Sequence, residues 1–115
     1  SDIYNCSDLL ILPSLHEGLP YAILEAMASK CVVVANNIVG IRSLIENNFN
    51  GILIDKNDFD LYVKTIKSLA INKRLRDKLT KNAFIYSKKF SRKSFMIEYI
   101  KFLKEIIIEK NEKTF

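Results

Sequence analysis

The chain has 115 residues, enough for one modest domain with a single core, and it is 49% hydrophobic and 27% charged, an ordinary globular balance. No apolar run approaches the roughly 20 residues that a membrane-spanning helix needs, and the N-terminus lacks the basic and apolar segments of a signal peptide. Because the first residue is not Met, we expect the chain to begin within a longer protein.

The net charge of +5 is unevenly distributed along the chain. Residues 1–60 hold three basic and eight acidic side chains, whereas residues 61–115 hold fifteen basic and five acidic ones, so the two halves carry −5 and +10. A basic half suits peripheral contact with an anionic membrane surface or with an acidic partner. The alternative is compositional, because the whole chain is rich in Lys, Asn and Ile.

The two cysteines, Cys6 and Cys31, have no metal-ligand spacing. We interpret them as reduced thiols, which favours a cytoplasmic protein. No cluster of metal-ligating residues is visible, so neither a metal nor another cofactor is expected.

Three short apolar runs predict strands that are buried on both faces, as in a parallel sheet: Leu9–Leu12, Val32–Ala35 and Gly51–Ile54. A helix from about Pro20 to Ser29 is predicted between the first two, and a short helix over residues 41–46 before the third. Strands that alternate with helices imply parallel pairing through right-handed crossovers. The predicted fold class is therefore α/β, a partial doubly wound (Rossmann-like) sheet of about three strands.

C-terminal helices follow the third predicted strand. Asp58 can cap a helix that runs to about Ala70, a second helix is predicted over residues 73–89, and Ser91 can cap a last helix to about Lys110. The apolar sector of this last helix is too wide for a surface helix that contacts only one neighbour. Likewise, the strand Leu9–Leu12 carries no charge or Pro to protect an exposed edge, so we expect the chain to self-associate there if no other strand covers it.

Glu17 and Glu25 flank the predicted start of the first long helix. A helix N-terminus presents free backbone N–H groups and the positive end of a dipole, which suits phosphate. Carboxylates on either side can accept hydrogen bonds from sugar hydroxyls. This division of labour suits a sugar–diphosphate–ribose ligand, that is, a nucleotide sugar.

At these residues the chain resembles the donor-binding segment of the retaining, family-4 type glycosyltransferases of the GT-B fold (the glycosyltransferase group 1 domain). Two glutamates with this spacing are a hallmark of that family, and further blocks follow in the same order. The blocks are Leu12-Pro13-Ser14, His16-Glu17-Gly18-Leu19-Pro20, Leu24-Glu25-Ala26-Met27-Ala28, Val32-Val33-Val34-Ala35, Val39-Gly40-Ile41 and Asn50-Gly51-Ile52-Leu53-Ile54. The resemblance fades after about Asp55.

The resemblance implies a glycosyltransferase of polysaccharide or glycolipid biosynthesis, which transfers a hexose-type sugar from a nucleoside diphosphate to a glycan or glycolipid acceptor with retention. Residues 1–115 would form the C-terminal portion of its nucleotide-sugar-binding domain, about half of that domain. The first strands, the diphosphate-binding loop and the acceptor domain would lie in an N-terminal part, which is then a required partner. We therefore expect the chain alone to be inactive.

The resemblance also assigns roles to the two carboxylates. Glu17 is implied to accept hydrogen bonds from hydroxyls of the donor sugar and is the candidate catalytic residue. Glu25 is implied to bind the ribose hydroxyls. The neighbouring His16 is expected to be a loop residue near the site and not an acid or base. No protein nucleophile is implied, because the leaving diphosphate itself assists the reaction.

The remaining donor-binding residues act through their backbone in this interpretation. Gly18, Leu19 and Pro20 shape the loop and approach the sugar, while Tyr21 and Ala22 present N–H groups to the phosphates. Asn36, Asn37 and Gly40 follow a strand at the same edge of the sheet, and we do not expect them to contact ligand. Where the family has Gly and Pro, this chain has Lys30 and Val32, which predicts a strained or altered turn at Lys30.

Two other functions remain open from the sequence. The chain could be a catalytically silent, truncated product or a partner-binding subunit, which a coding region upstream would decide. A nucleic-acid binder is supported only by charge and is not expected, because helical core packing better explains the aromatic residues of the basic half.

Overall fold

A computed structural model describes residues 2–13, 15 and 21–113 of the chain. Its elements are α1 (Asp2–Asn5), β1 (Leu9–Leu12), α2 (Tyr21–Ala28), β2 (Val32–Asn36), α3 (Val39–Arg42), β3 (Ile52–Ile54), α4 (Phe59–Ile71), α5 (Lys73–Ser87), the 3-10 turn η1 (Lys88–Phe90) and α6 (Arg92–Glu112). The short helix α1 is not among the elements predicted from the sequence.

The three strands form one parallel sheet in the order β1-β2-β3, which confirms the predicted fold class. Leu9 is aligned with Val32 at the start of the first pair, and Val34 with Ile52 at the start of the second. All five residues of β2 are buried, as expected of a central strand. Among the described residues, β1 pairs with β2 alone and so lies at an edge, as the sequence predicted.

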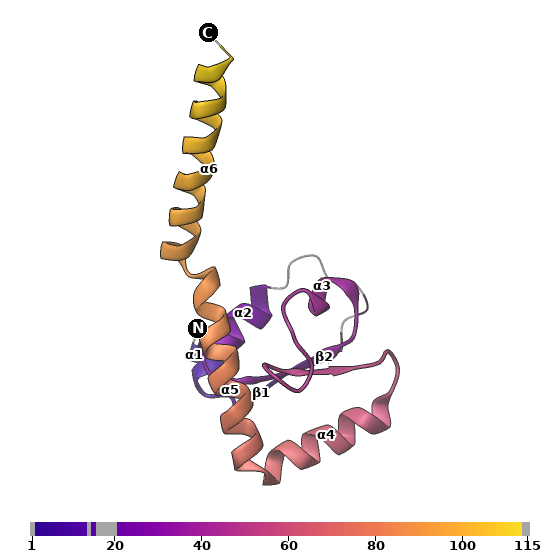
Figure 1. Cartoon of the computed structure of the whole chain (residues 1–115). Coiled ribbons are helices and arrows are strands. Elements are labelled where there is room, and N and C mark those ends of the chain that lie inside the picture. The colour runs from indigo at the N-terminus through magenta and orange to yellow at the C-terminus, as the bar shows by residue number, and fades with distance from the viewer. Residues whose placement is uncertain (1, 14, 16–20, 114–115) are drawn as a thin grey trace.

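Successive residues of β2 point to opposite faces of the sheet, and each face has its own core. On one face, Val33 and Ala35 belong to a buried cluster that includes Ile23 and Met27 of α2. On the other face, Val32 and Val34 pack with residues of α4 and α5. Figure 1 shows α2 and α5 side by side over the sheet, with α4 below.

Ala26 is fully buried, although the spacing of residues in α2 places it away from the larger apolar side chains of the helix. The reason is tertiary: α5 packs on α2, and Ala26 lies in the same buried cluster as Ala83 of α5. Small side chains at these positions let the two helices approach closely.

The short helix expected over residues 41–46 is wrong in its bounds, because α3 covers Val39–Arg42. Its continuation is replaced by a loop that one side chain holds. Asn50 Oδ1 accepts from the Glu46 backbone N–H at 2.8 Å, and Asn50 Nδ2 donates to the Leu44 carbonyl oxygen at 3.2 Å. Asn50 is buried, and its two bonds satisfy one backbone donor and one backbone acceptor of this loop.

Helix caps confirm the predicted starts of α4 and α6. The Asp58 side chain accepts from the Leu61 backbone N–H at 3.0 Å, and Ser91 Oγ accepts from the Ser94 N–H at 3.2 Å.

The Lys73–Asp77 ion pair of α5 is exposed and therefore adds little stability.

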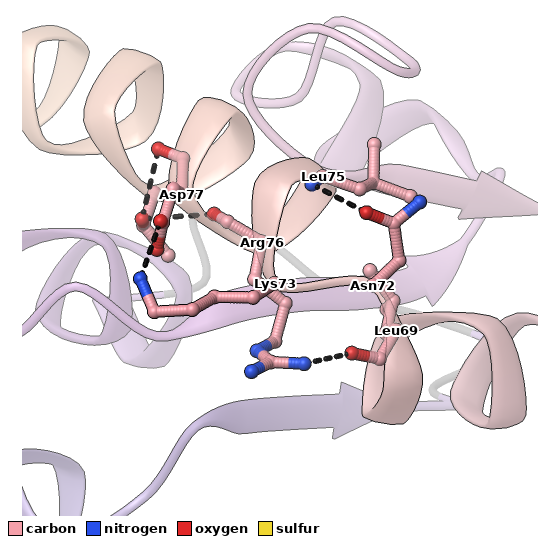
Figure 2. A network of polar contacts seen from close by, with 7 residues as sticks. Leu69, Asn72, Lys73, Leu75, Arg76 and Asp77 are labelled. Atoms are coloured by element: carbon pink, nitrogen blue, oxygen red, sulfur yellow. Dashed lines mark hydrogen bonds and ion pairs between the residues drawn. The ribbon is translucent and has the colours of Figure 1, made fainter.

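The junction of α4 and α5 is held by two side chains (Figure 2). Asn72 Oδ1 accepts from the Leu75 N–H at 3.0 Å and begins α5. The Arg76 guanidinium reaches back to the last turn of α4 and donates to the carbonyl oxygens of Leu69 and Ala70. These bonds satisfy carbonyl groups that the end of α4 leaves free, so they define how the two helices join.

Lys30 has a left-handed backbone with φ of 60°, as its departure from the family pattern predicted. It follows α2 in a Schellman motif: the Cys31 N–H donates to the Ala26 carbonyl oxygen at 2.9 Å, and the Lys30 N–H to that of Met27 at 3.2 Å. Glycine adopts this conformation without strain, whereas Lys has a Cβ that crowds the backbone.

The last helix, α6, extends away from the sheet (Figure 1), and its described side chains include no buried one. Large apolar side chains of this helix are 40% to 58% exposed from Leu103 to Ile107. The described chain therefore leaves uncovered the wide apolar sector that the sequence predicted to need more than one neighbour. No described helix is both long enough and apolar enough to cross a bilayer.

Candidate functional site

The start of α2 lies beyond the carboxyl end of β1, where a doubly wound sheet places its ligands. Ile23 and Met27 are fully buried and hold the helix against the sheet. Tyr21 is 68% exposed and Ala22 half-buried, so the first turn of the helix borders solvent. The first N–H groups of an α-helix have no partner within it, and they can therefore bind phosphate at this place.

Of the predicted site residues, the structure brings together Tyr21, Ala22 and Glu25 on the first two turns of α2. Glu25 is exposed, on the side of the helix away from its buried residues. The other predicted residues, Glu17, Gly18, Leu19 and Pro20, lie outside the described residues, as does His16. The pairing of Glu17 with Glu25 across one ligand therefore stays a prediction.

Glu25 lines a cleft of about 960 Å³ between α2 and the segment where α5 passes through η1 into α6. We call it the α2–η1 cleft. Its apolar lining residues are Tyr21, Leu24, Ala28, Phe84 and Phe90. Its charged lining residues are Glu25, Lys88, Lys89, Arg92 and Glu98. The cleft therefore offers carboxylates that accept from hydroxyl groups, cations that bind anions, and an apolar surface between them.

Aromatic rings lie beneath the cations around this cleft. The Lys88 ammonium lies 4.8 Å from the centroid of the Phe84 ring, and the Lys30 ammonium lies 5.2 Å from the same ring. Lys89 lies 5.2 Å from the Tyr86 ring, whose hydroxyl donates to the Ser43 carbonyl oxygen at 3.2 Å. Such contacts attract the ammonium group to the face of the ring.

At the carboxyl end of β2, two asparagines have structural partners. Asn36 is buried, and its Oδ1 accepts from the Tyr62 hydroxyl at 2.7 Å. Asn37 Nδ2 donates to Asp55 Oδ1 at 3.2 Å, while its own Oδ1 is buried with no hydrogen-bond partner among the described residues. Burial also raises the pKa of the Tyr62 hydroxyl, which keeps it protonated as a donor to Asn36.

Within the described ranges, no three His, Cys, Asp or Glu side chains gather as metal ligands would. Cys31 is buried, and its thiol donates to the carbonyl oxygens of Tyr4 and Ser7 at 3.1 and 3.0 Å. Burial, and secondarily the Asp8 carboxylate, raise the pKa of this thiol, so it is an inert part of the core.

The site residues predicted from the sequence do not include Lys88, Lys89, Phe90 and Arg92. Their signal was present as a run of basic residues beside an aromatic one, directly before the Ser91 cap. The local pattern indicates only a general positive charge for this run, because nothing in it shows that α5 returns to α2.

Residues 1–85 match the family model described as "Glycosyl transferases group 1". An Escherichia coli UDP-Gal:alpha-D-GlcNAc-diphosphoundecaprenol alpha-1,3-galactosyltransferase is 39% identical over 74 residues, which are 64% of this chain and 19% of that protein. A Campylobacter jejuni N,N'-diacetylbacillosaminyl-diphospho-undecaprenol alpha-1,3-N-acetylgalactosaminyltransferase is 32% identical over 106 residues, 91% of this chain and 28% of that protein. The chain thus spans less than a third of the length of these two relatives.

Solved structures agree with this match. The C-terminal domain of the group 1 family protein LpcC from Francisella tularensis superposes with a TM-score of 0.71 at 27% identity, over 78% of this chain and 47% of that one. Anabaena HepE in complex with UDP-glucose superposes with a TM-score of 0.81 at 23% identity, over 90% of this chain and 29% of that one. The sheet and helices described above are therefore part of a GT-B fold.

Proposed function

Since this chain belongs to the family of group 1 glycosyl transferases, we propose that it forms the C-terminal portion of the nucleotide-sugar-binding domain of a longer enzyme. The enzyme transfers a sugar from a nucleoside-diphosphate donor to an acceptor with retention of configuration. The observation that carries this proposal is the position of Tyr21, Ala22 and Glu25, on the first turns of α2 at the carboxyl edge of a parallel sheet.

In this proposal the N–H groups of Tyr21 and Ala22 bind the donor's phosphates, where the helix dipole also favours negative charge. The Glu25 carboxylate accepts hydrogen bonds from the ribose hydroxyls. Glu17 accepts from the hydroxyls of the transferred sugar, in the loop whose backbone at Gly18, Leu19 and Pro20 approaches that sugar. The protein positions the donor and stabilises developing charge, so no metal and no protein nucleophile takes part.

We further propose a lipid-linked diphosphate as the acceptor, because two relatives act on diphosphoundecaprenol-linked sugars by their names. Such an acceptor lies in a membrane, and the basic second half of the chain suits a peripheral position at the cytoplasmic face. The N-terminal part of the enzyme completes the site. The 115 residues alone therefore transfer no sugar, and robust transfer by the purified chain would contradict this division.

The test replaces each carboxylate by its amide in the enzyme that contains these residues. Glu25→Gln should weaken binding of the nucleoside diphosphate alone by roughly 10- to 100-fold, because a hydrogen bond to a charged group contributes about 1.5–3 kcal/mol. Glu17→Gln should lower kcat/KM for the natural donor similarly while leaving nucleoside-diphosphate binding unchanged. Glu46→Gln, an exposed carboxylate beyond α3, is the matched control.

The measurements are calorimetric titration with UDP and GDP, and initial rates over a donor concentration series. Wild-type kinetics and nucleotide affinity in both Glu17→Gln and Glu25→Gln would refute the assignment of the site. Products with inverted configuration at the transferred sugar, determined by NMR of the anomeric proton, would refute retention alone.

A further inference from the structure

The positive charge of the chain is concentrated in one segment. Residues 73–93, which comprise α5, η1 and the start of α6, hold nine basic side chains and one acidic one. The remaining residues hold nine basic and twelve acidic side chains. The segment therefore carries a net charge of +8 and the rest of the chain −3, so a general richness in Lys does not explain the distribution.

The cations of this segment gather on the outer side of α5. Leu79, Ala83 and Ser87 are buried and define the inner side of the helix. With about 3.6 residues per turn, the opposite side carries a row of five exposed residues, which spans about 21 Å. The row consists of Arg74, Lys78, Lys81, Ile85 and Lys88, and we call it the α5 cationic face. In Figure 1, α5 runs along one side of the described fold.

Three cations of this face are available to an external anion. Within α5, Lys73 already pairs with Asp77 at 2.6 Å. By contrast, Arg74, Lys78 and Lys81 form no ion pair with a carboxylate in the part of the chain that the structure describes. Like charges three and four residues apart repel one another along a helix. An anionic partner would relieve this repulsion, so the face favours one.

Ile85 indicates which kind of anionic partner fits the face. It is 55% exposed and lies within the row, between Lys81 and Lys88. A nucleic-acid backbone offers phosphates to the cations but no apolar surface to Ile85. A phospholipid surface offers both, because phosphate headgroups lie directly above hydrocarbon. Lys side chains suit this place, since their apolar stems can lie along hydrocarbon while the ammonium groups stay at the headgroups.

We propose that the α5 cationic face docks on the anionic phospholipid surface of a membrane, with Arg74, Lys78, Lys81 and Lys88 at the headgroups and Ile85 at the edge of the hydrocarbon. The inference rests on the proposed function only for the side of the membrane, because the cytoplasmic face is part of that proposal. It adds the surface that makes the contact, and with it an orientation. The axis of α5 lies parallel to the membrane, and the side of the helix that packs on the sheet faces away from it.

The test is flotation of the 115-residue chain with vesicles in a density gradient, in which aggregates sink and bound protein rises. Vesicles of equal parts phosphatidylglycerol and phosphatidylcholine should carry the chain upward at about 0.1 M salt, and vesicles of phosphatidylcholine alone should not. Raising the salt to about 0.5 M should release the chain, because the screening length falls from about 10 Å to roughly 4 Å.

Charge removal on the face should abolish most of this binding. A basic residue near an anionic surface strengthens binding by about fivefold, so the variant Arg74→Gln/Lys78→Gln/Lys81→Gln should weaken partition onto the anionic vesicles by roughly 100-fold. The variant Arg74→Lys/Lys78→Arg/Lys81→Arg should retain it, because the charge stays in place.

Two further variants separate the position of the charge from its amount and from the apolar contribution. The matched control, Lys56→Gln/Lys64→Gln/Lys67→Gln, removes the same charge from exposed positions in and before α4 and should bind far more tightly than the face variant. Ile85→Ser should weaken partition without changing its salt dependence, because it removes only apolar surface. Circular dichroism of each variant verifies that it is folded.

Four results would overturn the inference. They are equal flotation of the wild type and the face variant, equal losses in the face variant and the matched control, equal flotation with phosphatidylcholine alone, and absence of flotation with any vesicle. Tighter binding of a short DNA duplex than of the anionic vesicles would also overturn it and would identify a nucleic acid as the partner.

The flotation assay uses no donor, acceptor or catalysis, so its failure is distinguishable from a failure of the proposed function. If the longer enzyme binds UDP or GDP and transfers sugar while the α5 cationic face has no effect on vesicle binding, only the docking inference fails. If the chain binds anionic vesicles through this face while the longer enzyme binds no nucleoside diphosphate, the proposed function fails and the docking surface stands.

Discussion

The left-handed turn after α2 predicts that the exchange of alanine for glycine has opposite effects on stability at residues 28 and 30. At Lys30, where φ is 60°, glycine should be more stabilising than alanine. At Ala28, the last residue of α2, alanine should be more stabilising than glycine. Comparing Lys30→Gly with Lys30→Ala removes the lysine in both, so the contact with Phe84 and the charge cancel.

The magnitude follows from two opposing contributions. A left-handed backbone costs a residue with a Cβ about 1–2 kcal/mol, which Gly does not incur. Gly also gains freedom in the unfolded chain, which reduces its advantage by about 0.4–1 kcal/mol. Lys30→Gly should therefore exceed Lys30→Ala in stability by roughly 1 kcal/mol. Ala28→Gly, by contrast, should lose about 0.5–1 kcal/mol, because both backbone freedom and helix propensity act against it.

The assay is urea unfolding followed by circular dichroism for the wild type and the three variants. A difference of about 1 kcal/mol shifts the midpoint temperature of a domain of this size by about 4–8 °C, so thermal unfolding gives an independent measurement. If Lys30→Ala equals or exceeds Lys30→Gly in stability, residue 30 does not have the left-handed backbone and the Schellman motif described here is wrong.

Three further substitutions test the packing that positions the site. Gly51→Ala should cost about 1–3 kcal/mol in urea unfolding, because its Cβ would lie 3.0 Å from Ile45 Cγ2 and 3.1 Å from the Val33 carbonyl oxygen, whereas Gly40→Ala within α3 should be neutral or stabilising. Tyr62→Phe should cost about 1–3 kcal/mol at neutral pH, since it removes a buried hydrogen bond to Asn36. Because the folded pKa of Tyr62 is raised above its ordinary value of 10.0, the stability it contributes is complete below that pH and is lost above it. The difference between wild type and Tyr62→Phe should therefore shrink above pH 10, and a constant difference would contradict the burial of the hydroxyl. Ile11→Lys, on the 41% exposed edge residue of β1, should reduce self-association of the chain in light scattering, whereas Ile85→Lys on α5, 55% exposed, should not; equal scattering by the two would place the association elsewhere.

The features that the sequence predicted well are those with local physical causes. The strand β1 has the predicted bounds, because a short run of apolar residues before Pro13 has few other stable conformations. Asp58 and Ser91 begin helices where their side chains were expected to accept from backbone N–H groups. The turn at Lys30 was anticipated from one missing glycine. In the two caps and the turn, the bonded partners are within five residues of one another.

The features that the sequence analysis missed depend on contacts between distant segments. Ala26 is buried because α5 returns to pack on α2, and nothing within α2 indicates that neighbour. Likewise, α3 ends earlier than predicted, and Asn50 bonds to the backbone of residues 44 and 46 in the loop that follows. Helix propensities do not describe such side-chain bonds. The candidate site shows the same limit. Glu25 and the start of α2 follow from a local pattern, whereas the cations of η1 reach the α2–η1 cleft only through tertiary structure.

The last helix shows that an apolar sequence pattern can predict a packing contact without identifying the neighbour that makes it. The hydrophobic effect is non-directional. The apolar side chains of α6 therefore indicate that the helix packs against a neighbour, and they do not distinguish protein from lipid. Charge is more informative, because it selects the chemistry of the neighbour. Glu98, Glu105 and Glu109 recur on one side of α6 at helical spacing. Lys88 and Lys89 precede the helix, and Arg92 is its first residue. An anionic ligand is therefore favoured beside Lys88, Lys89 and Arg92, and disfavoured further along the helix, on the side that carries Glu105 and Glu109.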